Sequence, residues 1–145
     1  MRLSTRGEYG FRAMLDLAQR SSEGLVQARV IAARQSIPPA YLNHLMTSLR
    51  RAGLIVSIRG PGGGHSLARS PSLITLGQIL EALQGPYSPV ECVAKDMETE
   101  CRRAATCALR QVWQEIKGAT EGVLGSRTLA DLLRMEREQA PTYHI

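Results

Sequence analysis

Apolar residues recur at helical spacing in two short segments near the start of the chain. The first segment begins at Thr5 and Glu8, whose spacing is that of a capping box, in which each side chain satisfies a backbone N–H of the first turn. Apolar residues then recur three and four positions apart up to Ala18, and Gly24 marks the end of the region. The second segment covers residues 26–33. Both segments are predicted to be amphipathic helices.

A third helix is predicted to begin at Pro38 and Pro39, because proline is tolerated in the first turn of a helix but not in its interior. Gly53 follows the helix as a C-terminal cap. Two short helices separated by a tight turn, the second with a polar outer face, outline a helix-turn-helix motif. The apolar stripe of the third helix consists of Tyr41, Leu42, Leu45, Met46 and Leu49.

A glycine-rich run, RGPGGG, follows this motif. The segments LIVSIR and HSLAR on its two sides have the pattern of short strands, so the run is predicted to be the tip of a β-hairpin. It is not a catalytic phosphate loop, because no lysine follows the glycines. A plain turn needs only two glycines, and four favour close approach of the backbone to a partner, with Arg59 able to reach a phosphate or a minor groove. Three helices followed by a hairpin is the order of a winged helix.

The second half of the chain is also mostly helical in pattern. A helix is predicted from the capping-box pair Thr75 and Gln78 to Gly85, and a long segment with little periodicity follows it. A long helix is then predicted from near Ala105, with a break or bend within residues 117–126, and a short helix comes last. The fold class is therefore mainly α with a small β-hairpin. We divide the chain into a winged helix-turn-helix domain (1–71), a connecting helix (72–86), a cysteine-bearing loop (87–107), a long helix with a short terminal helix (105–134) and a disordered tail (135–145).

The positive charge is confined to the N-terminal half. Residues 1–71 contain ten arginines and no lysine against three acidic residues, a net charge of +7, whereas the rest of the chain carries −2. The planar guanidinium of arginine can form two parallel hydrogen bonds with a phosphate. A segregated, arginine-only surface favours a nucleic-acid partner over a merely solvated basic face.

The chain shows no sign of a membrane or secreted location. It has no apolar run near the ~18 residues that a membrane-spanning helix needs. Its first residues, MRLSTRGEYG, lack the apolar region of a signal peptide. We therefore expect a cytoplasmic protein with no membrane partner.

We expect the polar residues near the start of the third helix to face the major groove, where asparagine can form two hydrogen bonds with adenine. The histidine among them is by itself more often an ordinary surface residue than a base reader. Arginines at the end of the helix are expected to hold backbone phosphates. The candidate DNA-contacting residues are Pro39, Ala40, Tyr41, Asn43, His44, Thr47, Arg50, Arg51, Arg59, Gly60, Gly62 and Gly63.

The three cysteines of the chain, Cys92, Cys101 and Cys107, lie close together in sequence. An odd count does not suit a secreted disulfide framework, and clustered thiols in a reducing compartment indicate metal or redox chemistry. Iron–sulfur clusters are held by thiolates, whereas structural zinc sites usually show Cys-x-x-Cys pairs, which are absent from the sequence. Three thiols are one short of the usual four ligands. Spacing alone therefore favours metal or cluster binding and simple thiol redox sensing equally.

Several of these segments together resemble the Rrf-two family of bacterial winged-helix transcription regulators, which includes IscR-, NsrR- and RirA-like members. The matching segments are MRLSTRGEYGFRAMLDLA, YLNHLMTSLRRAGLI, RGPGGGHSLAR and the three-cysteine loop, and the resemblance fades after about Leu133. It implies a homodimer in which the helix around residues 105–118 packs against its mate. It also implies a double-stranded DNA operator, read by the third helix in the major groove and by the wing, residues 59–64, in the minor groove. Finally, it implies an iron–sulfur cluster, 2Fe-2S or 4Fe-4S, on Cys92, Cys101 and Cys107.

Two positions depart from the IscR-like members of the family. Those members carry a histidine ligand three residues after the last cysteine, and here that position is Arg110, which stays protonated. The NsrR-like pattern instead uses a carboxylate near the N-terminus, which matches Glu8, donated from the other subunit. The capping role of Glu8 is the competing interpretation. Asn43 stands where many IscR-like members have glutamate, so their operators are not carried over to this chain.

The sequence therefore predicts a dimeric DNA-binding transcription regulator whose operator affinity is controlled by an iron–sulfur cluster. The cluster would sense iron, iron–sulfur supply, redox state or nitric oxide. The alternative is a cluster-free winged-helix regulator that senses by cysteine oxidation or through a partner protein. An enzyme acting on a small-molecule substrate is not expected, because His44 and His65 lie in the predicted DNA surface and no nucleophile–base–orienter set is present.

Overall fold

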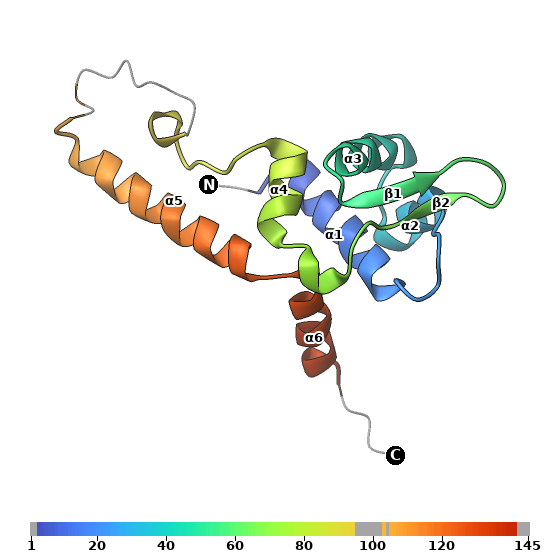
Figure 1. Cartoon of the computed structure of the whole chain (residues 1–145). Helices are drawn as coiled ribbons and strands as arrows, with labels where there is room; N and C mark the ends of the chain where they lie inside the picture. Colours follow the sequence, from blue (N-terminus) through green and yellow to red (C-terminus); the bar gives the residue numbers. More distant parts are fainter. Residues whose placement is uncertain (1–2, 95–102, 104, 142–145) are drawn as a thin grey trace.

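The computed structural model describes residues 3–94, 103 and 105–141 of the chain. It confirms the predicted fold class, because the chain is mainly helical and contains one two-stranded antiparallel hairpin (Figure 1). None of the described helices is long and apolar enough to cross a membrane. In chain order the elements are α1 (Thr5–Gln19), α2 (Ala28–Gln35), α3 (Pro39–Arg51), β1 (Ile55–Ile58), β2 (Gly64–Leu67), the 3₁₀ turn η1 (Pro71–Leu73), α4 (Leu76–Gln84), the 3₁₀ turn η2 (Glu91–Val93), α5 (Ala108–Ser126) and α6 (Leu129–Gln139).

The N-terminal cap of α1 is Ser4, one residue earlier than predicted. Ser4 Oγ accepts a hydrogen bond from the Gly7 N–H at 3.0 Å and donates one to Gln84 Oε1 of α4 at 2.5 Å. Serine and threonine are both good N-caps, and the contact with α4 favours the serine. The capping box predicted for Thr5 and Glu8 is therefore wrong, and Glu8 plays no part in capping the helix.

The helix-turn-helix of α2 and α3 forms close to where it was predicted. α2 begins two residues later, because Val26 forms a backbone bridge with His65: each N–H donates to the other's carbonyl oxygen at 2.8 Å. Ser36 ends α2 in the left-handed conformation (φ +53°), and Pro39 occupies the first turn of α3 as predicted. Gly53 (φ +75°) follows α3 and lets the chain turn into β1.

The second half of the chain supplies part of the same core. The Leu129 N–H donates to the Ile74 carbonyl at 3.0 Å, and the Leu76 N–H donates to the Arg127 carbonyl at 2.9 Å. These bonds join the segment after the hairpin to the segment before α6, so α6 packs on α1 although α5 separates α6 from the winged helix in sequence. The predicted capping box of Thr75 and Gln78 at the start of α4 is confirmed. The largest buried apolar side chains are Met14, Leu17, Ile31, Leu42, Leu45, Met46, Leu49, Leu54, Ile74, Ile79 and Leu129.

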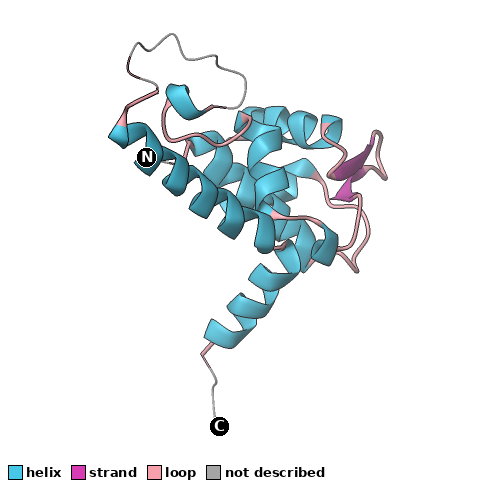
Figure 2. Cartoon of the chain, turned by 60° about the vertical axis from the view of Figure 1, so that its left-hand side comes forward, coloured by secondary structure: helices cyan, strands magenta, loops and turns pink. Residues whose placement is uncertain are grey.

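α5 is one continuous helix of 19 residues, so the break predicted within residues 117–126 is wrong (Figure 2). Glycine costs a helix about 1 kcal/mol relative to alanine, but unlike proline it leaves the backbone hydrogen bonds intact. α6 extends to Gln139, so residues 135–139 are helical and do not belong to a disordered tail.

Asp16 is the only charged side chain in the buried core of the described residues, and it joins α1 to α2. Its carboxylate accepts hydrogen bonds from Arg34 Nη2 at 2.6 Å and Nε at 2.9 Å, and from Gln35 Nε2 at 3.0 Å. Arg20 Nε lies 3.8 Å away. Burial raises the pKa of Asp16, but the hydrogen bonds and the two arginine charges outweigh it, so the pKa lies below its ordinary value of 3.8.

We predict that Asp16→Asn lowers the free energy of unfolding by about 2–3 kcal/mol, because the substitution leaves two arginines facing an uncharged group inside the fold. Urea unfolding at pH 7 followed by circular dichroism measures the change. Glu23→Gln is the matched control: Glu23 is exposed and pairs with Arg20 at 3.7 Å, so its loss should cost less than about 0.5 kcal/mol. Because the folded pKa of Asp16 is depressed, its contribution is present above pH 3.8 and is lost as the pH falls through that lowered pKa. Equal effects of the two substitutions would contradict the assignment.

Candidate nucleic-acid interface

The polar face of α3 is exposed, as predicted, while its apolar stripe is buried in the core. Tyr41 and Thr47 are half-buried, and Thr47 Oγ1 donates to the Asn43 carbonyl at 3.0 Å. The exposed residues of the helix are Pro39, Ala40, Asn43, His44, Arg50 and Arg51. All the candidate contact residues of α3 are therefore at least partly accessible, and most lie on its outer face.

Tyr41 is held in place from α1. Its ring meets the ring of Tyr9 edge to face, with centroids 5.7 Å apart, and the guanidinium of Arg12 lies 4.7 Å from the centroid of the Tyr9 ring. Arg12 Nη1 also donates to the Gln35 carbonyl at the end of α2, at 3.1 Å. Aromatic and cation–π contacts of this kind are directional. The start of α3 is therefore fixed relative to both preceding helices.

The arginines of the N-terminal half fall into two groups with different roles. The first group, Arg6, Arg12, Arg20 and Arg34, forms hydrogen bonds, ring contacts or ion pairs with other helices or with acidic residues. Arg29 is exposed and donates to the nearby Gln27 Oε1 at 2.7 Å. The second group, Arg50, Arg51, Arg59 and Arg69, is also exposed, and in the described part of the chain these four form no hydrogen bond or ion pair. The second group lies at the end of α3 and on the hairpin, which projects from the helices beside α3 (Figure 1).

The hairpin itself requires most of its glycines. Gly60 has a φ of +106°, which side chains rarely adopt. A Cβ on Gly63 would lie 2.0 Å from the Ile58 carbonyl oxygen, and a Cβ on Gly64 would lie 2.7 Å from the Val26 carbonyl oxygen. Only Gly62 faces open space without an unusual φ. Three of the four glycines thus have reasons within the fold, and Gly63, a candidate DNA contact, is buried.

His65 holds the hairpin in place; it was expected in the predicted DNA surface but was not one of the candidate contact residues. Besides its backbone bridge with Val26, its Nδ1 forms a hydrogen bond of 2.7 Å with Ser57 Oγ on the facing strand. Burial, and to a lesser degree the charge of Arg50, lower the pKa of His65 below its ordinary value of 6.5, so the ring is neutral at pH 7. Alternation along β2 could have indicated its inward side. No sequence signal indicated the bridge with Val26.

Two of the three predicted cluster ligands lie on elements that pack together. Cys92 is in η2 and Cys107 immediately precedes α5; both are free and half-buried. Arg110, in the first turn of α5, donates from Nε to the Cys92 carbonyl at 3.4 Å and links the two elements. Cys101 lies outside the described residues. In a single copy, the residues that the structure describes contain no group of three or more His, Cys, Asp or Glu placed to hold a metal ion.

Comparison with known proteins identifies the family. The model of Rrf2, described as an iron-dependent transcriptional regulator, matches residues 3–135. The chain belongs to the Rrf2 family. It is 42% identical over 132 residues to the transcriptional regulator CymR of Bacillus subtilis, covering 91% of this chain and 89% of CymR. It is 35% identical to IscR of Photobacterium profundum, covering 92% and 76% of the two chains. The solved structure of T. potens IscR superposes with a TM-score of 0.79 at 37% identity, covering 99% and 94%.

Membership of the Rrf2 family confirms the resemblance seen in the sequence. These relatives are named as transcriptional regulators, so the chain is a DNA-binding regulator of transcription and not an enzyme.

The four glycines of the wing allow a test that separates folding from DNA contact. Gly63→Ala should distort the turn and weaken DNA binding by tenfold or more, because its Cβ would overlap backbone at Ile58. Gly62→Ala, the matched control, should leave the unfolding free energy within about 0.5 kcal/mol of wild type, since it meets no neighbour. Urea unfolding and fluorescence anisotropy with labelled duplex DNA measure both quantities. A fully tolerated Gly63→Ala would contradict this account of the turn.

Proposed function

We propose that this Rrf2 protein is a homodimeric cytoplasmic regulator whose affinity for a double-stranded DNA operator depends on an iron–sulfur cluster, 2Fe-2S or 4Fe-4S. The cluster would be held by Cys92, Cys101 and Cys107. The observation that carries this proposal is the packing of η2 on α5, which brings two free, half-buried thiols onto adjoining elements. Thiolates are the usual ligands of such clusters. When bound, the cluster supplies redox chemistry that responds to iron supply, oxygen or nitric oxide.

The fourth ligand in this proposal is Glu8 from the second subunit. Arg110 occupies the position of a local histidine ligand and is engaged with the Cys92 carbonyl, so it offers no electron pair to a metal. Because Ser4 caps α1, the exposed carboxylate of Glu8 has no hydrogen bond or ion pair with the described residues. It is therefore available to a neighbouring copy.

Dimerisation through α5 is supported by the apolar side chains that this helix leaves uncovered. Leu109, Val112 and Val123 are exposed by 63%, 46% and 59%, and no residue of α5 is buried. An amphipathic helix with an uncovered apolar face is typical of an interface. In this proposal, residues 105–134 form the dimerisation helix and the terminal helix, and residues 87–107 form the cluster loop between the connecting helix (72–86) and the dimer.

DNA would be read by two elements of the winged-helix domain. The start of α3 enters the major groove, where Asn43 can pair with adenine and Ala40 can contact a thymine methyl group. The wing approaches the adjacent minor groove, and Arg50, Arg51 and Arg59 neutralise phosphates. The absence of intramolecular partners for these arginines in the described part of the chain supports this role.

A second candidate for the sensor is the thiols themselves, without a cluster. Arg110 in place of a histidine ligand favours it, as does the similarity to CymR, the global cysteine regulator of B. subtilis, whose structure is solved. That structure is 41% identical, covers 91% of this chain and 95% of CymR, and superposes with a TM-score of 0.74. In this alternative, oxidation of the same three cysteines would alter operator affinity.

Operator binding is tested first by selecting duplexes from a random DNA pool with the purified full-length chain. We predict that Arg59→Ala weakens binding to the selected duplex and reduces the slope of log K against log salt by about 0.9, the value for one phosphate contact. Anisotropy titrations between 50 and 200 mM salt, roughly the range where such slopes are measured, give the result. Arg137→Ala on α6 is the control, because that exposed arginine lies away from α3 and the wing, and it should leave the slope unchanged. An unaltered slope for Arg59→Ala would contradict the phosphate contact.

The sensor is tested by anaerobic purification of the untagged protein, followed by its absorption spectrum and its iron and acid-labile sulfide content per chain. We predict near-stoichiometric iron and sulfide, and loss of the visible absorbance in Cys101→Ala. Glu8→Gln should retain a cluster but change its spectrum and its rate of loss in air, because one ligand is altered. If the protein stays colourless after reconstitution with iron and sulfide, the cluster is ruled out as the sensor and the thiols themselves become the candidate.

A further inference from the structure

Arg6 joins three helices of the winged-helix domain at one point. It lies in the first turns of α1, donates from Nε to the Leu83 carbonyl in the last turn of α4 at 2.6 Å, and donates from Nη2 to Ser48 Oγ of α3. Ser48 Oγ in turn donates to the His44 carbonyl, at 3.3 Å, on the helix that carries the DNA-facing residues. Arg6 is half-buried, and the edge of its guanidinium formed by Nε and Nη2 is occupied by these two bonds within the fold.

The α1–α4 contact beside Arg6 is unusually close. A Cβ on Gly10 would lie 1.9 Å from Leu83 Cδ1, and a Cβ on Gly7 would lie 3.0 Å from Gln84 Oε1. Ser4, the cap of α1, is bonded to the same Gln84. The last turn of α4 is thus locked to the first turns of α1, and a displacement of one must move the other.

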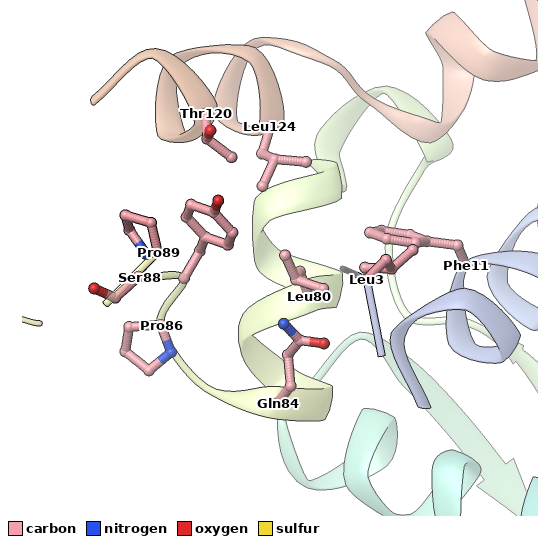
Figure 3. Close-up of a pocket in the computed structure, with 10 residues that line it drawn as sticks. Leu3, Phe11, Leu80, Gln84, Pro86, Ser88, Pro89, Thr120 and Leu124 are labelled. Atoms are coloured by element: carbon pink, nitrogen blue, oxygen red, sulfur yellow. The ribbon is translucent and has the colours of Figure 1, made fainter. Parts of the chain in front are cut away.

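The cysteine-bearing loop leaves the fold from this same turn of α4. Gly85 (φ +81°) ends the helix, and the chain then runs through Pro86 to Pro89 along a cavity of about 560 Å³ between α4 and α5. Figure 3 shows the side chains that line this cavity: Leu80 and Gln84 of α4, Leu124 of α5, and Pro86 and Pro89 of the loop along a further side. The loop is therefore anchored at its start to the turn whose carbonyl Arg6 holds.

We propose that Arg6 is the positioning residue that couples the state of the cysteine loop to the recognition helix. A change in the loop acts on the last turn of α4, and Arg6 passes this change to Ser48 and hence to the orientation of α3. This inference rests on the proposed sensing function, since it needs a loop with two states. It assigns no contact with DNA or with a cluster to Arg6.

A purely structural role for Arg6 would give a different result. Removal of a structural contact lowers stability and operator affinity alike in both loop states, and so leaves the ratio of the two dissociation constants unchanged. Removal of a coupling contact reduces that ratio, because the two sites no longer bias a common element. The ratio is therefore the quantity to measure.

The experiment measures Kd for the selected duplex by anisotropy, with reduced apoprotein and with protein reconstituted with iron(II) and sulfide. If reconstitution yields no colour, the second state is protein oxidised with diamide. For wild type we expect a ratio of tenfold or more, within the usual range of about 5–150-fold for coupled sites. Arg6→Ala and Ser48→Ala should each reduce it to within twofold, and the double variant should reduce it no further, because both act on one link. Arg6→Lys should restore part of the ratio, since an ammonium can reach one acceptor but lacks the fork.

Arg12→Ala is the matched control: this arginine is also on α1, also half-buried and also bonded to a backbone carbonyl, but that carbonyl belongs to α2. It should change affinity in both states and keep the wild-type ratio. If Arg6→Ala fails to fold, Ser48→Ala, which removes one hydroxyl, decides the matter. A preserved ratio in Ser48→Ala and in any folded Arg6 variant overturns the assignment to Arg6. A wild-type ratio of one in every state overturns the proposed sensing itself, and leaves DNA binding as it stands.

Discussion

The buried carboxylate of Asp16 is the constraint on which the DNA-binding half depends. A charge in an apolar core is tolerated only when it is paired and hydrogen-bonded, and here two arginines and a glutamine surround it. Two of these partners, Arg34 and Gln35, belong to α2 and fix its orientation against α1, whereas Arg20 follows α1 itself. The position of α3 follows from that of α2, because the turn between them is short and is fixed at Ser36. An apolar residue at position 16 could fill the same space but would not select one orientation of α2 against α1.

Arginine has two different roles in residues 1–71, one within the fold and one on the surface. Arg34, Arg12 and Arg6 stabilise the fold, because each guanidinium donates hydrogen bonds to acceptors on neighbouring helices. Arg50 and Arg59 remain outside, where the guanidinium can meet phosphate. The net charge of +7 already subtracts Asp16 and Glu23, but it still overstates the electrostatic footprint for DNA, because Arg6 and Arg12 form their hydrogen bonds within the fold. The field that a duplex meets comes from the end of α3 and from the wing.

The sequence predicted elements well where the signal was local. Proline pairs, capping boxes and strand alternation located α3, α4 and the hairpin, because each acts through a few neighbouring residues. Predictions from the sequence were wrong where contacts between distant residues determine the ends of an element. The cap of α1 is Ser4 and not the predicted Thr5, because only Ser4 also reaches Gln84. Val26 lies outside the helix predicted for it, because its backbone pairs with that of His65. The glycines of α5 did not break it, since nothing in that stretch removes a backbone donor.

The same distinction applies to the candidate interface. Spacing in the helix-turn-helix was sufficient to place Asn43 and His44 on the outer face, since a helix period fixes which side a residue takes. It could not show that Gly63 is buried against Ile58, because that contact arises only when the two strands pair. Nor could it divide the arginines into internal and external groups, since the partners of Arg6 and Arg34 lie far away in sequence.

The placement of the cysteine loop explains how one DNA-binding scaffold can serve different sensing chemistries. The loop is attached at one end to α4, which packs closely against α1, and at the other to α5, whose apolar face is uncovered in the described part of the chain. Any chemistry that alters the loop, whether a cluster or an oxidised thiol, acts on the same two attachments. In the coupling that we propose, the DNA-binding domain would respond to the position of α4 and not to the identity of the ligand. Replacing a local histidine by Arg110 would therefore change what the protein senses while leaving the route to α3 intact.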